Sequence, residues 1–351
     1  PDLPLKWDSD NSGRATQKAA YGLLSRVALY AEKWDVAAQA ARDCATAEGN
    51  LDLSENGYAK IFELGINSPE VLFAVEFKSS VIDHAYDAYV RPSGDTKELG
   101  KQVYSGFVPT SELVDSYEMA GDGGNFSWEK HGKDPYANRE PRFYATILYN
   151  GADWMGRKIE SFVGGKDGYK AYENAGAAGT TVTGYYLRKY LIDGDKTWVT
   201  SGSGQDWIVL RYAEVLLNKA EALAMENWNK NSAEALQALN DVRARVGLPA
   251  RATADKETFL EYVRHERKVE LAGEGFRYWD LRRWRLAEKV IDGQNVHGVK
   301  ISKQSDGSFT YEQVDADGGH KRIFYDRYYR FAIPLSERSN NSLCTNNDGW
   351  I

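Results

Sequence analysis

The stretch RYAEVLLNKAEALAMENWNKNSAEALQALNDVRARVGLP (Arg211–Pro249) decides the fold of this protein. Apolar residues recur in it every three or four positions in two successive stripes, which predicts two amphipathic helices. The stripes are Ala213, Leu216, Leu217, Ala220 and Leu223, and then Leu236, Leu239, Val242 and Val246. Gly247 and Pro249 should stop the second helix, because glycine followed by proline is a common signal at a helix C-terminus. The stretch is therefore predicted to be a helical hairpin.

Two further helical hairpins are predicted, one on each side. The first covers residues 14–48, where Asp35 can cap the second helix. Residues 206–293 hold the quoted hairpin and a third one, from about residue 255 onward. The residues at helical spacing are Leu23, Val27, Ala31, Trp34, Ala37, Ala38, Ala41 and Ala45 in the first hairpin, and Phe259, Val263, Phe276, Trp279, Leu286 and Val290 in the third. Alanine-rich hairpins that return along a chain are typical of tetratricopeptide-like superhelices.

A long segment, residues 50–205, separates the first hairpin from the others. It is rich in Gly, Tyr and Trp and has only short apolar runs, which indicates loops and short strands. Residues 294–351 look similarly irregular, with a β-hairpin expected to turn at Asp317–Gly319. The predicted fold class is therefore mainly α: one domain built as a tetratricopeptide-like superhelix, with a long loop-rich insertion that carries short strands.

The composition describes a globular chain and argues against several functions. Hydrophobic residues make up 42% of the 351 residues, which is enough apolar material for a large core. The formal net charge of -7 gives no overall attraction to a phosphate backbone, so we expect no nucleic-acid partner. The sequence has no apolar run near the roughly 18 residues that a membrane helix needs.

No pattern commits the sequence to a cofactor or a metal, and we expect neither. Cys44 and Cys344 are too few for a disulfide framework and lack metal-ligand spacing. Residues 8–13 imitate the start of a calcium loop, but the twelfth position is Ala19, where a bidentate glutamate should stand. A helix cap by Ser12 or another small polar residue explains this cluster more simply.

Several ordered blocks resemble the signature of the SusD/RagB family. They are GRATQKAAYGLLSRVALYAEKWDVAAQAA (Gly13–Ala41), PTSELVDSYEM (Pro109–Met119), DPYANREPRFYATILYNG (Asp134–Gly151), RYAEVLLNKAEALA (Arg211–Ala224), ALNDVRARVGLP (Ala238–Pro249), ERKVELAGEGFRYWDLRRW (Glu266–Trp284) and FAIPLSER (Phe331–Arg338). The resemblance implies a nutrient-binding protein that captures oligosaccharide or polysaccharide and delivers it to a SusC-like TonB-dependent transporter. It also implies an outer-membrane location at the cell surface, through an N-terminal lipid anchor that, like the family's first helix pair, has no counterpart in this sequence.

The loops of residues 50–205 hold the candidate ligand-binding residues. In the family, binding residues come from variable loops, including those before and after the block Pro109–Met119. Two segments there, DHAYDAYVRP (Asp83–Pro92) and FSWEKHGKDPY (Phe126–Tyr136), mix rings with charged side chains. Flat rings suit the apolar faces of sugars, and the polar neighbours suit hydroxyl groups. The candidates are Tyr86, Tyr89, Arg91, Trp128, His131 and Trp154, with Tyr89 and Trp128 as stacking platforms and Arg91 as a hydroxyl partner.

Carboxylates one helical turn apart raise the alternative of an enzyme. Glu266, Glu270 and Glu274 could share one helix face, but Arg277 is spaced to pair with Glu274 and Asp280 along the helix, which favours a structural interpretation. A glycoside hydrolase needs two carboxylates about 5–10 Å apart, and no motif commits a pair to that role. We therefore expect no enzyme activity. Peptide binding or another protein interaction on the same scaffold stays open as the second function.

Overall fold

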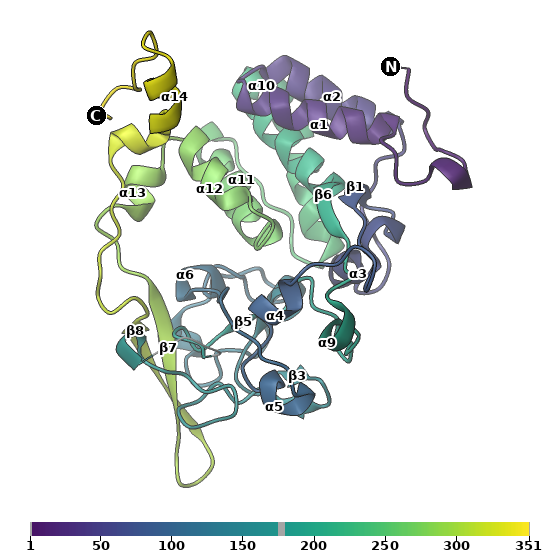
Figure 1. Ribbon diagram of the computed structural model, residues 1–351. Helices are drawn as coiled ribbons and strands as arrows, with labels where there is room; N and C mark the ends of the chain where they lie inside the picture. The colour runs from purple at the N-terminus through teal and green to yellow at the C-terminus, as the bar shows by residue number, and fades with distance from the viewer. Residues whose placement is uncertain (1, 175–179, 351) are drawn as a thin grey trace.

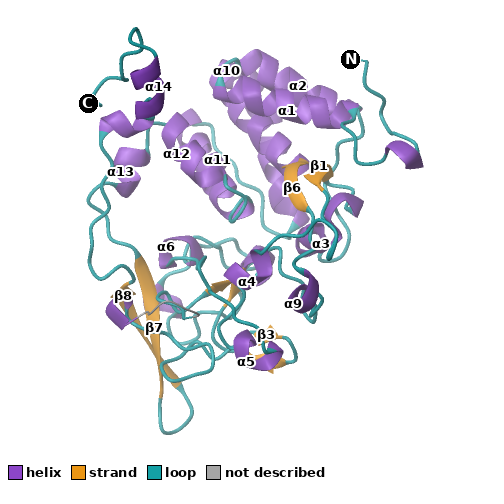
Figure 2. Cartoon of the chain, in the orientation of Figure 1, coloured by secondary structure: helices purple, strands orange, loops and turns teal. Residues whose placement is uncertain are grey.

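The computed structural model describes residues 2–174 and 180–350. Its α-helices are α1 (Gln17–Tyr30), α2 (Trp34–Thr46), α3 (Gly57–Leu64), α4 (Tyr86–Val90), α5 (Asp95–Leu99), α6 (Ser111–Val114), α7 (Trp128–His131), α8 (Pro141–Thr146), α9 (Trp198–Ser201), α10 (Tyr212–Arg245), α11 (Lys256–Glu270), α12 (Phe276–Arg283), α13 (Ala287–Ile291) and α14 (Leu335–Asn340). Short 3-10 helices cover Ser9–Asn11, Gly65–Asn67, Tyr172–Asn174 and Asp326–Tyr329. The long helices lie together in the upper half of the view, above the loop-rich insertion (Figure 1; Figure 2).

The described strands form two-stranded antiparallel pairs. They are β1 (Val71–Val75) with β6 (Trp207–Arg211), β2 (Ile147–Leu148) with β5 (Tyr186–Leu187), β3 (Asp153–Trp154) with β4 (Arg157–Lys158), and β7 (His297–Lys303) with β8 (Phe309–Asp315). In the first pair, Ala74 lies opposite Ile208. Because β1 lies early in the insertion and β6 directly follows it, this pair brings the two ends of the insertion together.

The predicted helical hairpins are confirmed as the main scaffold. α1 packs on α2, α2 on α10, and α10 on α11, around one large apolar core. Asn227 breaks α10 with an extended backbone (φ -164°, ψ 93°), so α10 contains the two helices of the quoted hairpin with almost no loop between them. α10 ends at Arg245, and Gly247 has a positive φ of 72°, as the C-terminal signal predicted. The fold is mainly helical with short strands, which confirms the predicted fold class.

The buried face of α1 is not the predicted one. Leu23 and Val27 are about half exposed, while the residues that face the scaffold are small except for one leucine. These buried residues are Ala19, Gly22, Ser25, Ala28 and Leu29. A Cβ added to Gly22 would lie only 2.8 Å from a side-chain methyl of Leu72, so the small residues allow close packing. The apolar spacing correctly predicted a helix here. Which face of the helix is buried depends on how closely the neighbouring elements can approach it.

Three other local predictions are wrong. α2 begins at Trp34 with Lys33 at its N-cap, so Asp35 lies in the first turn and is not the cap. Trp279 was expected among the packed apolar positions, but it is 46% exposed. The β-hairpin turns at residues 304–308, where Gly307 has a φ of 88°, and Asp317–Gly319 follow the end of β8. The Asp-Gly pair at 306–307 is the stronger hairpin signal.

Residues 8–13 contain a short 3-10 helix. Asp8 accepts a hydrogen bond from the backbone N–H of Asn11 and caps this turn, so the cap is a small polar residue other than Ser12, which lies at the C-terminal end of the turn. Within residues 2–174 and 180–350, no group of three or more His, Cys, Asp or Glu side chains is placed to hold a metal ion. Over the same described ranges, no helix has the length and apolar character that crossing a bilayer requires.

A buried charge network joins the insertion to α10 and α11. It consists of Arg142 with Glu140, Glu266 and Glu270; Arg211 with Glu70, Glu270 and Glu274; Arg243 with Glu118 and Glu266; Arg245 with Glu70 and Glu270; and Lys189 with Glu274. These side chains are at most 3% exposed. Glu266, Glu270 and Glu274 therefore pair with partners from other elements, and the predicted surface pairing through Arg277 is wrong. The burial of these three glutamates agrees with the prediction that they have a structural role.

The buried charge network should make the fold sensitive to acid. Burial alone raises the pKa of Glu270, but the charges of Arg245, Arg211 and Arg142 outweigh it and hold the pKa well below the ordinary value of 4.5. A carboxyl group whose pKa is lowered by folding adds stability above its unfolded pKa, and this stability is lost as the pH falls toward the folded pKa. We expect the Tm to fall progressively below about pH 4.3. Thermal unfolding followed by circular dichroism from neutral to about pH 3 tests this, and an unchanged Tm over that range would contradict it.

Candidate functional site

α4 stands at the centre of the candidate site because the chain around residues 202–205 fixes its start. His84 and Ser203 exchange two backbone hydrogen bonds, and the Ser203 hydroxyl accepts a third from the backbone N–H of Asp87 at 3.1 Å. A Cβ on Gly204 would lie 2.7 Å from the backbone nitrogen of Ser79, so only glycine allows these two segments to meet. Segments more than 100 residues apart in the sequence thus meet at α4.

Five rings near α4 form a contiguous group, which we call the aromatic ladder: Phe77, His84, Tyr86, Tyr190 and Trp207. The centroid distances are 4.6 Å for Phe77 and His84, 6.3 Å for His84 and Tyr86, 5.9 Å for Tyr86 and Trp207, and 4.8 Å for Tyr190 and Trp207. Most pairs meet edge to face, whereas Tyr190 stacks on Trp207 at an interplanar angle of 15°. Members of the aromatic ladder line two concave surfaces of different chemistry: Phe77 and Tyr190 line one, and Tyr86 and Trp207 line the other.

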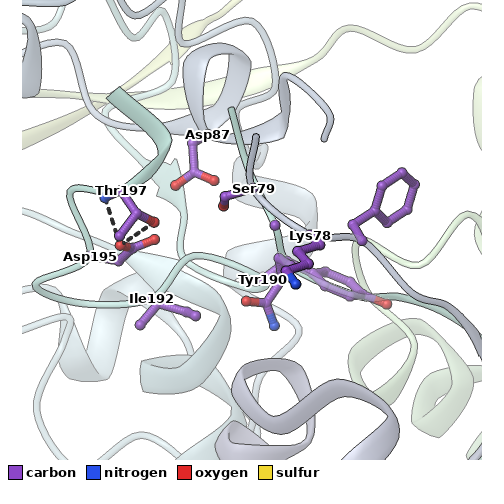
Figure 3. A pocket seen from close by; sticks show the side chains of 10 residues that line it. Lys78, Ser79, Asp87, Tyr190, Ile192, Asp195 and Thr197 are labelled. Carbon is purple, nitrogen blue, oxygen red and sulfur yellow. Dashed lines mark hydrogen bonds between the residues drawn. The ribbon is translucent and has the colours of Figure 1, made fainter. Parts of the chain in front are cut away.

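The first concave surface is a polar pocket of about 650 Å³. Its lining residues are Phe77, Lys78, Ser79, Asp87, Tyr190, Ile192, Asp195, Thr197, Gly204 and Gln205. Figure 3 shows Asp87 pointing from α4 toward the loop that carries Asp195 and Thr197, with Lys78 on the opposite side. The pocket therefore combines two carboxylates, hydroxyl groups, an amide and an amine with the rings of Phe77 and Tyr190.

The second concave surface is an apolar pocket of about 450 Å³. It is lined by Tyr86, Phe107, Val108, Pro109, Leu113, Leu187, Trp207, Gly273 and Gly275. Tyr86 contributes its ring here, and its hydroxyl donates to the carbonyl of Lys189 at 2.8 Å. Burial raises the pKa of Tyr86 above its ordinary value, so the hydroxyl stays protonated at neutral pH. Of the predicted site residues, Tyr86 is thus placed at the wall of a pocket, with its polar end already bonded.

Tyr89 forms an exposed stack with Tyr104. The two ring centroids are 5.1 Å apart at an interplanar angle of 24°. The rings are 48% and 45% exposed, so each keeps an open face. The backbone holds the stack in place, because the N–H of Tyr104 donates to Ala88 and the N–H of Gly106 donates to Tyr89, both at 2.7 Å. Phe107 follows directly and is also exposed, which makes this side of α4 an aromatic surface.

Arg91 and Trp154 lie together in the interior, which corrects their predicted contact with ligand. Both side chains are fully buried. The Arg91 guanidinium lies 5.2 Å from the ring centroid of Trp154, and the Trp154 Nε1–H donates to Asp95 at 3.0 Å. Arg91 also donates to Asp87 and to the carbonyls of Ile192 and Asp195. Arg91 therefore positions the polar pocket from behind and has no exposed surface with which to touch a ligand.

Trp128 and His131 lie on α7, in a different cluster from α4. The Trp128 Nε1–H donates to Asp115 at 2.9 Å, and its ring lies 6.1 Å from that of Tyr311 on β8. His131 shares a hydrogen bond with Ser127 and stacks on Phe126. Both rings are half-buried, and that of Trp128 packs against the core cluster that includes residues of β7 and β8. The structure thus brings Tyr86 and Tyr89 together but does not join Trp128 or His131 to them.

Several residues of the site were not predicted. Tyr104 and Phe107 continue the aromatic pattern that begins at Tyr86, and this pattern is the signal in the sequence that marks them. Tyr190 and Asp195 lie about 100 residues further along the chain, and no local pattern marks them. Only folding brings them next to Asp87.

Comparisons with known proteins agree on one family. The sequence model of the SusD family matches residues 69–350. A SusD-like protein of Bacteroides ovatus is 24% identical over 335 residues, which cover 89% of this chain and 55% of the relative. A crystal structure of a SusD-like protein from Bacteroides fragilis has a TM-score of 0.84 at 26% identity, over 99% of this chain and 68% of the other. A SusD-like carbohydrate-binding protein from the same species has a TM-score of 0.79 at 26% identity, over 97% and 67% of the two chains. The chain spans about half the length, or less, of the curated relatives that it matches.

Proposed function

The chain belongs to the SusD family, and from this premise we propose that it binds glycan at the bacterial cell surface. The solved relative described as carbohydrate-binding supports this class of ligand. In the same proposal, the protein has a lipid anchor in the outer membrane and delivers oligosaccharide to a SusC-like TonB-dependent transporter. These last roles rest on the family alone.

The observation that carries the proposal is the exposed stack of Tyr89 and Tyr104. Aromatic rings are normally covered when they pack in pairs, yet each of these rings keeps about half of its surface in solvent. A sugar ring has apolar C–H faces, and a flat, rigid aromatic face binds them at a small cost in conformational entropy. Clustered exposed rings are informative where single ones are not, and Phe107 extends this cluster. We take the Tyr89–Tyr104 stack as the platform for the glycan.

Tyr89→Ala is expected to weaken glycan binding by about three- to tenfold. A ring stacked on a sugar face should contribute ~0.5–1.5 kcal/mol beyond area burial, by analogy with aromatic pairs, and 1.4 kcal/mol is a tenfold change in Kd. A panel of maltohexaose, cellohexaose, laminarihexaose and xylohexaose first identifies a ligand of the wild-type protein by calorimetry. The same titration with the variant then measures the change.

Tyr172→Ala is the matched control, because Tyr172 is 50% exposed and lies outside the α4 surface. It should bind like the wild-type protein, and melting curves should show that both variants fold. Equal binding by Tyr89→Ala and the wild-type protein would place the glycan elsewhere. Sustained release of reducing sugar from the same oligosaccharides would instead contradict the assignment as a binding protein without turnover.

Peptide binding is the second candidate function, and the apolar pocket favours it. Val108, Pro109, Leu113 and Leu187 form an aliphatic wall that suits an apolar side chain better than a hydroxylated sugar. Val108→Ala would separate the two candidates, because Val108 lines this pocket and lies outside the cluster of exposed rings. Loss of affinity for a peptide library, with oligosaccharide binding unchanged, would favour the peptide.

A further inference from the structure

Each carboxylate of the polar pocket has one oxygen held by the protein and one left open. In Asp87, Oδ1 accepts from the Arg91 Nε–H at 2.7 Å. In Asp195, Oδ1 accepts from the backbone N–H and the hydroxyl of Thr197, both at 2.8 Å. Within the described residues, the second oxygen of either carboxylate has no protein partner. Asp87 is only 4% exposed and lines the cavity, so its open oxygen can be reached only from there.

One buried side chain connects the Asp87 carboxylate to the backbone of the loop that carries Asp195. Arg91 binds the Asp87 carboxylate, and its other nitrogen donates to the backbone carbonyls of Ile192 at 3.3 Å and Asp195 at 3.0 Å. The helix that carries Asp87 and the loop that carries Asp195 are therefore tied to the same guanidinium. Acceptors whose helix and loop are held in this way are preorganised to receive the donors of a ligand.

The charge of the lining selects against anionic ligands. Asp87 and Asp195 provide two negative charges, and the only basic residue among the described lining residues is Lys78, whose side chain is exposed at the rim. Arg91 offsets part of the Asp87 charge from behind, but it has no exposed surface and cannot bind a ligand carboxylate directly. A ligand carboxylate placed between two like charges would be repelled, whereas hydroxyl groups donate to them.

We propose that the polar pocket binds one or two neutral sugar residues, with hydroxyl groups donating to Asp87 and Asp195 and with Phe77 and Tyr190 beside the ring. A volume of about 650 Å³ lies in the range of sites for small molecules. This inference rests on the proposed function for its class of ligand. The polar pocket would be a second site that shares no lining residue with the apolar pocket, and its carboxylates would disfavour acidic glycans.

Matched sugars test the proposal. D-Glucose, D-galactose and D-mannose are each compared with the uronate that differs only at C6, by ligand-observed NMR titration. We expect at least one neutral sugar to bind and its uronate to bind at least tenfold more weakly. Asp195→Asn keeps an oxygen that can accept from Thr197 but removes the charge. This variant should bind the neutral sugar at least fivefold more weakly than the wild-type protein does. The ratio of the affinities for the neutral sugar and the uronate should also become smaller. Asp193→Asn is the control, because Asp193 is exposed and does not line the pocket. It should change neither the affinity for the neutral sugar nor the ratio of the two affinities.

A second variant keeps the test valid if Asp195→Asn is poorly folded. Ile192→Trp fills the pocket without altering its charge and should abolish monosaccharide binding. Equal affinities for the neutral sugar and its uronate would overturn the proposal. Equal sugar affinities of the Asp195→Asn and Asp193→Asn variants would overturn it as well. Oligosaccharide binding without any monosaccharide binding would overturn the pocket assignment while leaving the proposed function intact. Absence of binding to the whole hexasaccharide panel would contradict the proposed function itself.

Discussion

Glu270→Ala is expected to lower the free energy of unfolding by about 3–5 kcal/mol, the cost of breaking a buried ion pair by removing one partner. The Glu270 carboxylate pairs with Arg142, Arg211 and Arg245, and all four side chains are at most 1% exposed. Removing the carboxylate leaves three buried guanidinium groups with fewer negative charges to balance their positive charges. Urea unfolding at neutral pH measures the change.

Glu261→Ala provides the control in the same helix. Glu261 pairs with Arg264 at the surface of α11, and its side chain is 69% exposed. An exposed pair of this kind contributes about 0.2–0.5 kcal/mol, so this variant should unfold almost like the wild-type protein. Similar losses in the two variants would show that the buried charge network is not a source of stability.

Trp154→Ala should cost about 3–5 kcal/mol, because it removes a large buried side chain and leaves a cavity. The ring is fully buried, its Nε1–H donates to Asp95 at 3.0 Å, and it lies against the Arg91 guanidinium. The loss of packing next to Arg91 should also loosen the polar pocket. Monosaccharide binding is therefore expected to weaken together with stability.

Trp279→Ala is the matched comparison, since it removes the same side chain from an exposed position. The sequence analysis placed Trp279 among the packed residues and Trp154 among the ligand-binding ones. In the structure, Trp154 is buried and Trp279 is exposed. With its ring 46% exposed, Trp279 should contribute about 1 kcal/mol or less. Equal unfolding free energies for the two variants in urea would contradict this assignment of exposure.

Local patterns predicted the helical part of the fold because they depend only on near neighbours. The apolar spacing of residues 213–246 and the glycine at 247 specified two helices and their end, and the structure contains both. The resemblance in the ordered blocks identified the family, and the SusD family model that matches residues 69–350 confirms it. For α1, however, the same spacing marked Leu23 and Val27, which lie on the exposed face. Periodicity reports that a stripe is apolar, but packing against other elements decides which face is covered.

The sequence by itself determined the helical hairpins, the loop-rich insertion and the region of α4 as a candidate site. Only the tertiary structure decided the roles of its residues. Arg91, expected at the ligand, is buried behind Asp87, and Asp195 reaches the same pocket from more than 100 residues away. The physical reason is that a pocket is made by long-range contacts between segments, whose partners leave no periodic trace in either segment. Whether a charged or aromatic side chain meets solvent, a ligand or another side chain is settled only when those segments meet.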